Sequence, residues 1–305
     1  MNRRGFKRMK LLQTSEERFK DLPDFPFEPH FIEVDGINIH YIDEGTNQEE
    51  VILLMHGEPS WSFLYRHMIP ILVKGGYRVL APDLVGFGRS DKPTEQDDHT
   101  YKKHVGWMTA WLKLLDISNI TLFCQDWGSL IGLRVAIENQ ERFKRIVLSN
   151  GGLPTGEVRM SEAFFNWREF SRTATKFYVG RVVQGGTTTK LSRDVLNAYE
   201  APFPDDSFKA GARIMPSLVP INKDDPEHDT NKKAIEQFKK WKKPFLTAFS
   251  DEDPITRGGD KYWQENIPGA QGQKHTTIKN ASHFIQEDKG PELANLIIEF
   301  IKNNP

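Results

Sequence analysis

A carboxylate at a sharp turn is the first feature of this sequence that could carry chemistry. The apolar run "NITLFC" at residues 119–124 is followed by "QDWG" and then by a helical pattern. A strand that turns directly into a helix exposes one side chain at the top of a sheet, and it needs small residues two positions before and after that residue. Cys124 and Gly128 occupy those positions, so we predict that Asp126 is an exposed nucleophile beside the helix N-terminus, which favours an ionised carboxylate. The alternative is that Asp126 only caps the helix.

The loop "MHGEPSW", which follows the apolar run at residues 51–55, could supply a second part of the same site. In hydrolases with a strand, turn and helix of this kind, an oxyanion hole combines two backbone N–H groups. One follows the nucleophile and the other belongs to a loop after an earlier strand. We therefore expect the N–H groups of Glu58 and Trp127 to form an oxyanion hole. An ordinary turn after a buried strand is the alternative interpretation.

Two later loops offer a base and an acid. The segment "KNASHFIQED" puts His283 at the carboxyl end of the last expected strand, where ligands bind in open α/β sheets. The segment "PFLTAFSDEDPIT" ends another strand with three carboxylates, between the nucleophile and the base in chain order. We choose Asp253, which follows the small Ser250 at the usual spacing, and keep Asp251 in reserve. The other possible position for the acid, after "KRIVLS", holds Asn150 and no carboxylate.

An aspartate in place of a serine changes the reaction that the site could perform. Serine attacking a saturated carbon would leave an ether, whereas a carboxylate leaves an ester that water can hydrolyse. Asp126 therefore predicts displacement at an sp3 carbon. His283 would then activate the water, oriented by Asp253. The backbone N–H groups of Glu58 and Trp127 would stabilise the oxyanion of the tetrahedral intermediate.

Two leaving groups fit this chemistry. The oxygen of an epoxide needs a nearby acid, commonly a tyrosine, and Tyr178 and Tyr199 keep that reaction open. A halide ion needs weak neutral donors such as an indole N–H, and we expect Trp127, beside Asp126, and Trp167, in "SEAFFNWREF", to provide them. Such an aromatic cluster is more often plain core, but a segment above the sheet needs a face toward the cavity. We expect the phenylalanines around Trp167 to line the substrate pocket: Phe164, Phe165 and Phe170.

The elements that must position these residues alternate along the chain. Seven short apolar runs alternate with helical patterns: "INIHYI", "VILLM", "YRVLA", "NITLFC", "KRIVLS", "PFLTAF" and "KHTTI". This alternation indicates an α/β fold with a mostly parallel central sheet flanked by helices. Residues 101–116 and 290–304 have apolar residues at helical spacing, with Pro291 suited to the first turn of the second helix.

The alternation stops between Leu153 and about Trp241, where no buried strand is evident. We therefore predict a core domain of residues 1–152 and 241–305. A helical cap domain of residues 153–240 would be inserted after the sixth core strand.

The composition limits the classes of partner. The chain of 305 residues carries 41 Lys and Arg against 42 Asp and Glu, which gives no electrostatic reason to expect nucleic acid or an anionic membrane. One cysteine excludes an intramolecular disulfide and fits a reducing compartment. The basic segment "MNRRGFKRMKLLQTSEERF" lacks the apolar stretch of a signal peptide. We expect a cytoplasmic monomer that binds no metal. We also expect this N-terminal segment to be a solvated arm and residues 224–229 to form a solvated acidic surface.

At these residues the sequence resembles the haloalkane dehalogenases of the α/β-hydrolase superfamily. The resemblance extends from residue 30 to the C-terminus and rests on "HGEPSW", "QDWG", "FKRIVLSN", "AYEAPFPDDSFKAG" and "ASHFIQE". It implies the α/β-hydrolase fold and the cofactor-free conversion of a haloalkane and water into an alcohol, a halide ion and a proton. The alternatives are an epoxide hydrolase of the same fold and a binding protein that retains it.

The segment from Leu153 to Trp241 is similar to one branch of that family, which has its acid after the later strand and a second halide-binding Trp in the cap. By that resemblance Asp126 is the nucleophile, Asp253 the acid and His283 the base. The halide donors would be Trp127 and Trp167. One departure is a serine directly before the histidine, where relatives often have glycine.

Overall fold

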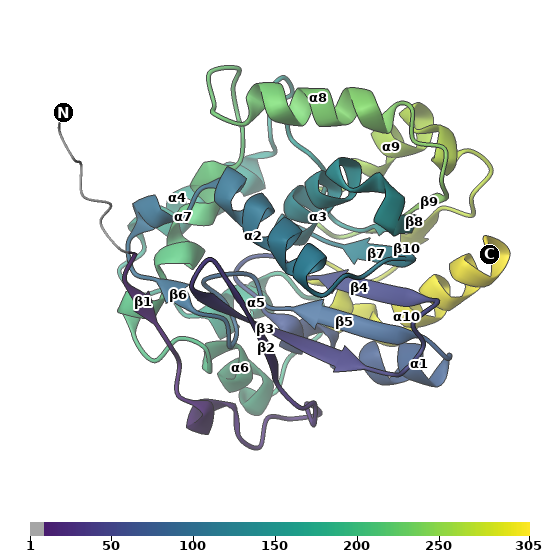
Figure 1. The fold of residues 1–305 in the computed structure, drawn as a ribbon. Coiled ribbons are helices and arrows are strands. Elements are labelled where there is room, and N and C mark those ends of the chain that lie inside the picture. The colour runs from purple at the N-terminus through teal and green to yellow at the C-terminus, as the bar shows by residue number, and fades with distance from the viewer. Residues whose placement is uncertain (1–8) are drawn as a thin grey trace, which may run out of the picture.

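A computed structural model describes residues 9–305, and its central feature is a sheet of eight strands (Figure 1). Across the sheet the strand order is β10, β9, β8, β7, β4, β5, β3 and β2. The strand β3 pairs antiparallel with β2 and β5, and the other neighbours are parallel. The strands are β2 (His30–Val34), β3 (Ile37–Glu44), β4 (Val51–Met55), β5 (Arg78–Pro82), β7 (Ile120–Cys124), β8 (Phe143–Leu148), β9 (Phe245–Ser250) and β10 (Thr276–Ile278).

The prediction of a mostly parallel sheet is confirmed. All seven apolar runs become strands, and β4, β7 and β9 are buried along their whole length, as expected for parallel strands covered on both faces. The strand β2 was not predicted, because it lies at the edge of the sheet and only its last residue, Val34, is buried.

Helices cover both faces of this sheet. In Figure 1, α2 and α3 lie over one face, and α1 and α10 pack together over the other. The predicted helix at residues 101–116 is α2, and the predicted C-terminal helix is the second part of α10. This helix is interrupted at Lys289, and Pro291 then lies in the first turn of its second part, where the missing N–H of proline costs no hydrogen bond. The helices are α1 (Ile69–Lys74), α2 (Tyr101–Leu114), α3 (Trp127–Glu138), α9 (Asp260–Asn266) and α10 (Ile285–Asn303).

Five further helices lie between β8 and β9 in the chain, in the segment where the strand rhythm stops. They are α4 (Glu162–Thr173), α5 (Val179–Gly185), α6 (Arg193–Glu200), α7 (Ala210–Leu218) and α8 (His228–Phe238). Side-chain contacts attach this segment to the rest of the molecule. The Tyr199 hydroxyl in α6 donates a hydrogen bond to Glu287 of α10, and Glu287 also forms a buried ion pair with Arg66.

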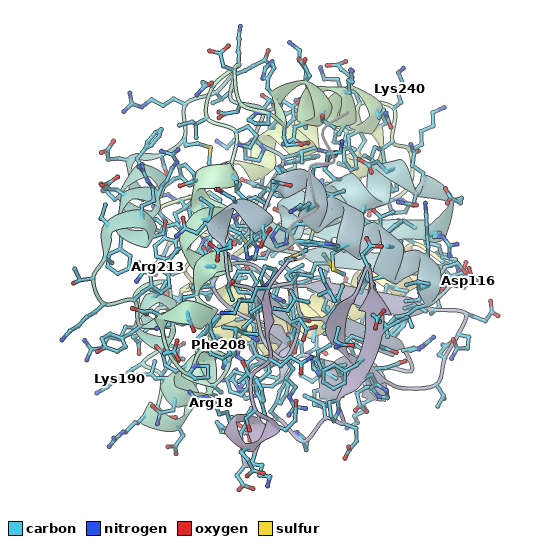
Figure 2. The ribbon with its side chains drawn as sticks, turned by 60° about the vertical axis from the view of Figure 1, so that its left-hand side comes forward. Arg18, Asp116, Lys190, Phe208, Arg213 and Lys240 are labelled. Carbon is cyan, nitrogen blue, oxygen red and sulfur yellow. The ribbon has the colours of Figure 1, made fainter. Side chains whose placement is uncertain are left out.

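The expectation of a solvated N-terminal arm is wrong for residues 9–19, while residues 1–8 lie outside the described residues. The strand β1 (Leu11–Leu12) pairs with β6 (Lys92–Pro93), and Phe19 is buried against Trp61. The Arg18 guanidinium donates to the carbonyl of Ala201 at 2.7 Å, just after the end of α6. Figure 2 shows Arg18 on the side of the molecule that carries Lys190 and Phe208. The arm is held because its apolar residues are buried and Arg18 satisfies a helix-terminal carbonyl.

The sequence analysis expected residues 224–229 to form a solvated acidic surface, and this is correct only in part. Asp224 and Asp229 are exposed, but Glu227 forms an ion pair with the buried Arg134 at 3.1 Å. The imidazole of His228 is buried and bonds to the carbonyl of Thr155. The ion pair joins the start of α8 to α3, and the two contacts keep part of this segment out of solvent. Among residues 9–305, no helix has the length and apolar character to cross a bilayer.

Candidate active site

Asp126 lies at the turn between β7 and α3, as the spacing of small residues predicted. Its backbone has φ 50° and ψ −130°, a left-handed conformation that is strained for an aspartate. The turn requires a neighbour without a Cβ, because a Cβ on Gly128 would lie 1.9 Å from the carbonyl oxygen of Met55. The Asp126 carboxylate makes no capping bond to the helix. The alternative of a simple N-cap is therefore excluded.

The Asp126 carboxylate is instead held by the loop after β4. The backbone N–H of Glu58 donates to Asp126 Oδ1 at 2.7 Å. A Cβ on Gly57 would lie 2.4 Å from the Cβ of Asp126, so only glycine lets the loop approach this closely. One predicted oxyanion donor therefore already contacts a carboxylate oxygen. The other predicted donor is the N–H of Trp127, the first residue of α3.

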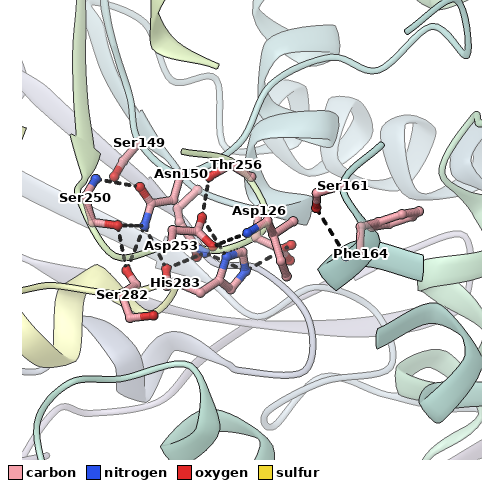
Figure 3. Close-up of polar contacts among 12 residues, drawn as sticks. Asp126, Ser149, Asn150, Ser161, Phe164, Ser250, Asp253, Thr256, Ser282 and His283 are labelled. Atoms are coloured by element: carbon pink, nitrogen blue, oxygen red, sulfur yellow. Dashed lines mark hydrogen bonds and ion pairs between the residues drawn. The ribbon is translucent and has the colours of Figure 1, made fainter. Parts of the chain in front are cut away.

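His283 lies between two carboxylates (Figure 3). Its Nε2 is 3.4 Å from Asp126 Oδ2, and its Nδ1 is 3.1 Å from Asp253 Oδ2. Burial alone would lower the pKa of His283, but the charges and hydrogen bonds of Asp253 and Asp126 outweigh it and raise that pKa to about 10. The three side chains come from loops after β7, β9 and β10, and the fold brings them together as the sequence analysis expected.

Asp253, and not Asp251, is the acid beside the histidine. Its side chain is fully buried. It also accepts hydrogen bonds from the N–H of Ile255 at 2.9 Å and from the hydroxyl of Thr256. Burial alone would raise the pKa of Asp253, but His283 and these hydrogen bonds lower it, so the carboxylate stays ionised. Asp251 points elsewhere, with its carboxylate 3.6 Å from the Lys279 ammonium.

The sequence analysis missed two amides that support the triad. The side chain of Asn150 donates to the Ser250 hydroxyl at 2.8 Å and to the carbonyl oxygen of Ser282 at 2.8 Å, and so joins the acid loop to the histidine loop. The Gln125 amide lies 3.2 Å from His283 Nε2 and donates to the carbonyl of the same residue at 3.1 Å. The signal that could have identified them is their position, since Gln125 directly follows β7 and Asn150 lies two residues after β8. The serine that departs from the family pattern, Ser282, donates its hydroxyl hydrogen bond to the carbonyl of Glu252 at 3.3 Å.

Two cavities reach the triad from different sides. The first, of about 530 Å³, is the proposed substrate cavity; its lining includes Asp126, Trp127, Phe164 and Trp167. The second, of about 520 Å³, is the histidine-side cavity; its lining includes Glu58, Trp167, Phe170, Tyr178 and His283. Trp167 and Ile255 line both cavities.

The three phenylalanines predicted to line the substrate pocket therefore have different surroundings. Phe164 faces the substrate cavity and Phe170 the histidine-side cavity. Phe165 lines neither of them and packs half-buried against the hydrophobic core. Trp127 is buried beside Tyr101, with ring centroids 5.1 Å apart, so its indole is held in a fixed orientation. The two predicted halide donors thus share one cavity with Asp126.

The Glu58 side chain is an unusual neighbour of these groups. It is buried, and within residues 9–305 neither carboxyl oxygen has a hydrogen bond of good geometry. Burial and the charge of Asp126 raise the pKa of Glu58 well above its ordinary value, while the Trp167 indole and His283 act in the opposite direction. A neutral carboxyl group is therefore favoured on the histidine side of Asp126.

The strand order and the turn after β7 define an α/β-hydrolase whose nucleophile position holds an aspartate. A family model described as alpha/beta hydrolase fold matches residues 50–290, so the chain belongs to that family.

Sequence similarity to known enzymes assigns the chain to a narrower family. Haloalkane dehalogenases from Psychrobacter cryohalolentis and Mycobacterium marinum are 53% and 50% identical, over 97% and 96% of this chain and 100% of each relative. The tetrameric structure of haloalkane dehalogenase DpaA from Paraglaciecola agarilytica NO2 matches with a TM-score of 0.89 and 35% identity, covering 94% of this chain and 97% of that one. The chain is a haloalkane dehalogenase by family, a hydrolase of the class that acts on carbon–halide bonds. The family that the sequence resembled is thereby confirmed.

Proposed function

We propose that this protein hydrolyses haloalkanes through a covalent alkyl ester on Asp126. One observation carries the proposal: the two oxygens of this carboxylate have different partners. Oδ1 accepts the Glu58 N–H at 2.7 Å, and Oδ2 lies 3.4 Å from His283 Nε2. The first oxygen is placed to become an oxyanion, and the second is placed to attack.

In the first step, Asp126 Oδ2 attacks the carbon that carries the halogen. A carbon–oxygen bond forms, the carbon–halogen bond breaks, and its electron pair leaves with the halide ion. The indole N–H groups of Trp127 and Trp167 stabilise the halide as weak neutral donors. The substrate cavity suits this step, since its lining combines these two indoles with Asp126 and with apolar side chains such as Leu130 and Phe164.

In the second step, water hydrolyses the ester. Alkylation removes the negative charge of Asp126, one of the two charges that raise the pKa of His283, so this pKa falls and the imidazole becomes available as a base. His283 takes a proton from water, and the hydroxide attacks the carbonyl carbon of the ester. The Glu58 and Trp127 N–H groups hold the oxyanion. Collapse of the intermediate breaks the bond to the alkyl oxygen, and the alcohol takes its proton from the His283 imidazolium. The proton of the added hydroxyl passes to water, which restores the carboxylate and accounts for the proton among the products.

Epoxide hydrolysis is the second candidate, and the two tyrosines expected to serve it, Tyr178 and Tyr199, do not favour it. The tyrosine that does line the cavity of Asp126 is Tyr262. An epoxide oxygen needs an acid near the attacked carbon, but neither Tyr178 nor Tyr199 lines the cavity that holds Asp126. The Tyr199 hydroxyl is already bonded to Glu287. Measuring halide release from a bromoalkane beside diol formation from an epoxide separates the two reactions.

Trapping the ester tests the proposed function most directly. His283→Phe should form one alkyl adduct on Asp126 with a bromoalkane, visible by intact mass and peptide mapping, because ester formation does not need the base. In the wild-type protein, a single turnover in water labelled with heavy oxygen should place the label in Asp126. Label that appears directly in the alcohol would contradict the proposal.

We further propose that residues 153–240 act as a cap domain, in which α4 supplies one wall of each cavity. We also propose that the protein is cytoplasmic, which its single cysteine supports, and that it works as a monomer. The relative described as tetrameric shows that another assembly is compatible with the fold. Light scattering of the purified protein decides between these states.

A further inference from the structure

Three buried polar side chains lead from His283 into the core, and neither step of the proposed reaction uses them. Gln125 directly follows β7, Gln286 lies in the first turn of α10, and Tyr65 ends the short 3-10 helix η2 (Ser62–Tyr65). None of these three residues, the polar row, lines the substrate cavity or the histidine-side cavity. Any effect of the polar row on the reaction therefore has to pass through His283.

The Gln125 amide turns its N–H side toward the histidine. Its Nε2 donates to the backbone carbonyl oxygen of His283 at 3.1 Å, and a carbonyl oxygen can only accept. The same amide nitrogen lies 3.2 Å from His283 Nε2. An amide nitrogen is a donor only, so Gln125 can bond to this ring nitrogen only when the ring nitrogen carries a lone pair. The amide therefore favours the neutral imidazole and opposes a proton on Nε2.

The other two members of the polar row hold this orientation from behind. The Gln286 Nε2 lies 3.5 Å from Gln125 Oε1. Gln286 Oε1 and the Tyr65 hydroxyl are both buried, and within residues 9–305 neither has a hydrogen bond of good geometry. Burial and, to a smaller extent, Cys124 raise the pKa of Tyr65 well above its ordinary value, although the adjacent Gln286 lowers it. The hydroxyl therefore keeps its proton and can donate to the free oxygen of Gln286, so the donors along the row all point toward the histidine.

The charges around His283 act in the opposite direction. Asp253 and Asp126 both raise its pKa. The other charged or titratable residues that line the histidine-side cavity with it are Glu58, Lys176, Tyr178 and Arg181. Arg66 and Glu287, the sequence neighbours of the two inner members of the polar row, neutralise each other in a buried ion pair. Alkylation removes the charge of Asp126 only, so the buried Asp253 still favours a protonated imidazole when the base has to be free.

We propose that Gln125 is a positioning residue that readies His283 to act as a base, and that Gln286 and Tyr65 fix its amide. This inference rests on the proposed function, in which the histidine loses its proton after the ester has formed. The positive end of the amide dipole faces Nε2, which favours the neutral ring with its proton on Nδ1, beside Asp253. Because the amide lies outside both cavities, the cavity side of the ring stays open to water.

The pKa of His283 in Asp126→Asn tests this effect without any substrate, because asparagine removes the same charge as alkylation does. NMR of protein labelled with 15N in its histidine rings follows the titration, and His283→Phe identifies the signals of this ring. In Asp126→Asn/Gln125→Met the pKa should be about one pH unit higher than in Asp126→Asn, since one donor to the neutral ring is lost. Asp126→Asn/Gln286→Met, which leaves the first amide in place, should raise it by less.

A matched variant removes an amide from another part of the core domain. The Gln264 amide donates to Thr247 and Asp260, so Asp126→Asn/Gln264→Met should leave the pKa of His283 unchanged. With Asp126 intact, Gln125→Met should move the acid limb of ester hydrolysis to higher pH and leave ester formation unchanged, because only the second step needs the base.

The inference is refuted if Gln125→Met leaves the pKa of His283 unchanged or lowers it, or if the matched variant raises it equally. If the Gln125→Met protein does not fold, Gln286→Met decides by the same criterion. Failure of the proposed function has a different signature: the pKa of His283 would rise as expected in Asp126→Asn/Gln125→Met, but no bromoalkane would release halide with the wild-type protein.

Discussion

The two oxygens of the Asp126 carboxylate have different partners: the amide of Glu58 binds Oδ1 at 2.7 Å, and His283 Nε2 lies 3.4 Å from Oδ2. This relationship joins three loops that are far apart in the sequence. It also makes the charge of His283 depend on that of Asp126. The first prediction follows from that dependence.

His283 should stabilise the fold in a way that is lost at alkaline pH. Its pKa is raised from 6.5 to about 10, mainly by Asp253 and Asp126 acting against burial. The folded protein therefore binds this proton more tightly than the unfolded chain, so the stabilisation is complete below pH 6.5 and is lost as the pH rises through 10. Urea denaturation should show that the difference in free energy of unfolding between wild type and His283→Phe shrinks from pH 7 to pH 10. A constant difference would contradict this.

Asp253→Asn should slow ester hydrolysis far more than ester formation. The carboxylate orients His283 and stabilises its charged form, and loss of an orienting acid costs about 10⁴-fold in a related triad. Burst kinetics should therefore show accumulation of the alkyl-enzyme. Asp251→Asn is the matched control, because that carboxylate faces Lys279 and not the histidine. Equal effects of the two variants would remove Asp253 from its proposed role.

Trp167→Phe should weaken halide binding. Loss of one indole N–H donor removes about 1.4 kcal/mol of hydrogen bonding, or about tenfold in Kd. Calorimetric titration with bromide suits this variant, because the mutation also changes the fluorescence signal. Phe165→Leu, close to Trp167 in α4 but lining neither cavity, should leave Kd unchanged. An unchanged Kd in Trp167→Phe would show that this indole does not bind halide.

Gly128→Ala should destabilise the fold, because the new methyl group would lie 1.9 Å from a backbone oxygen of Met55. Overpacking of this kind costs about 1–3 kcal/mol. Gly106→Ala, in the interior of α2 with nothing within 4 Å of the added atom, should instead gain about 0.5–1 kcal/mol from helix propensity. Thermal and urea denaturation compare the two. A Gly128→Ala protein as stable as wild type would mean that the turn can relax.

The sequence by itself determined the features that depend on neighbours along the chain. The apolar runs specified the buried strands, and the small residues around Asp126 specified the turn that exposes it. His283 was identifiable because parallel strands end at a common edge, where a polar residue after a strand meets the others. These properties depend on periodicity and local backbone sterics, which a single chain displays directly.

Tertiary structure decided the features that depend on contacts between distant segments. It selected Asp253 over Asp251, placed Asn150 between two loops, and assigned Phe164 and Phe165 to different surroundings. It also buried Phe19, although the leader looks polar by composition. The two cavities on either side of Trp167 arise only when residues between β8 and β9 pack above the sheet. Hydrophobic packing and hydrogen bonding over such separations follow from the whole arrangement, so no local pattern reports them.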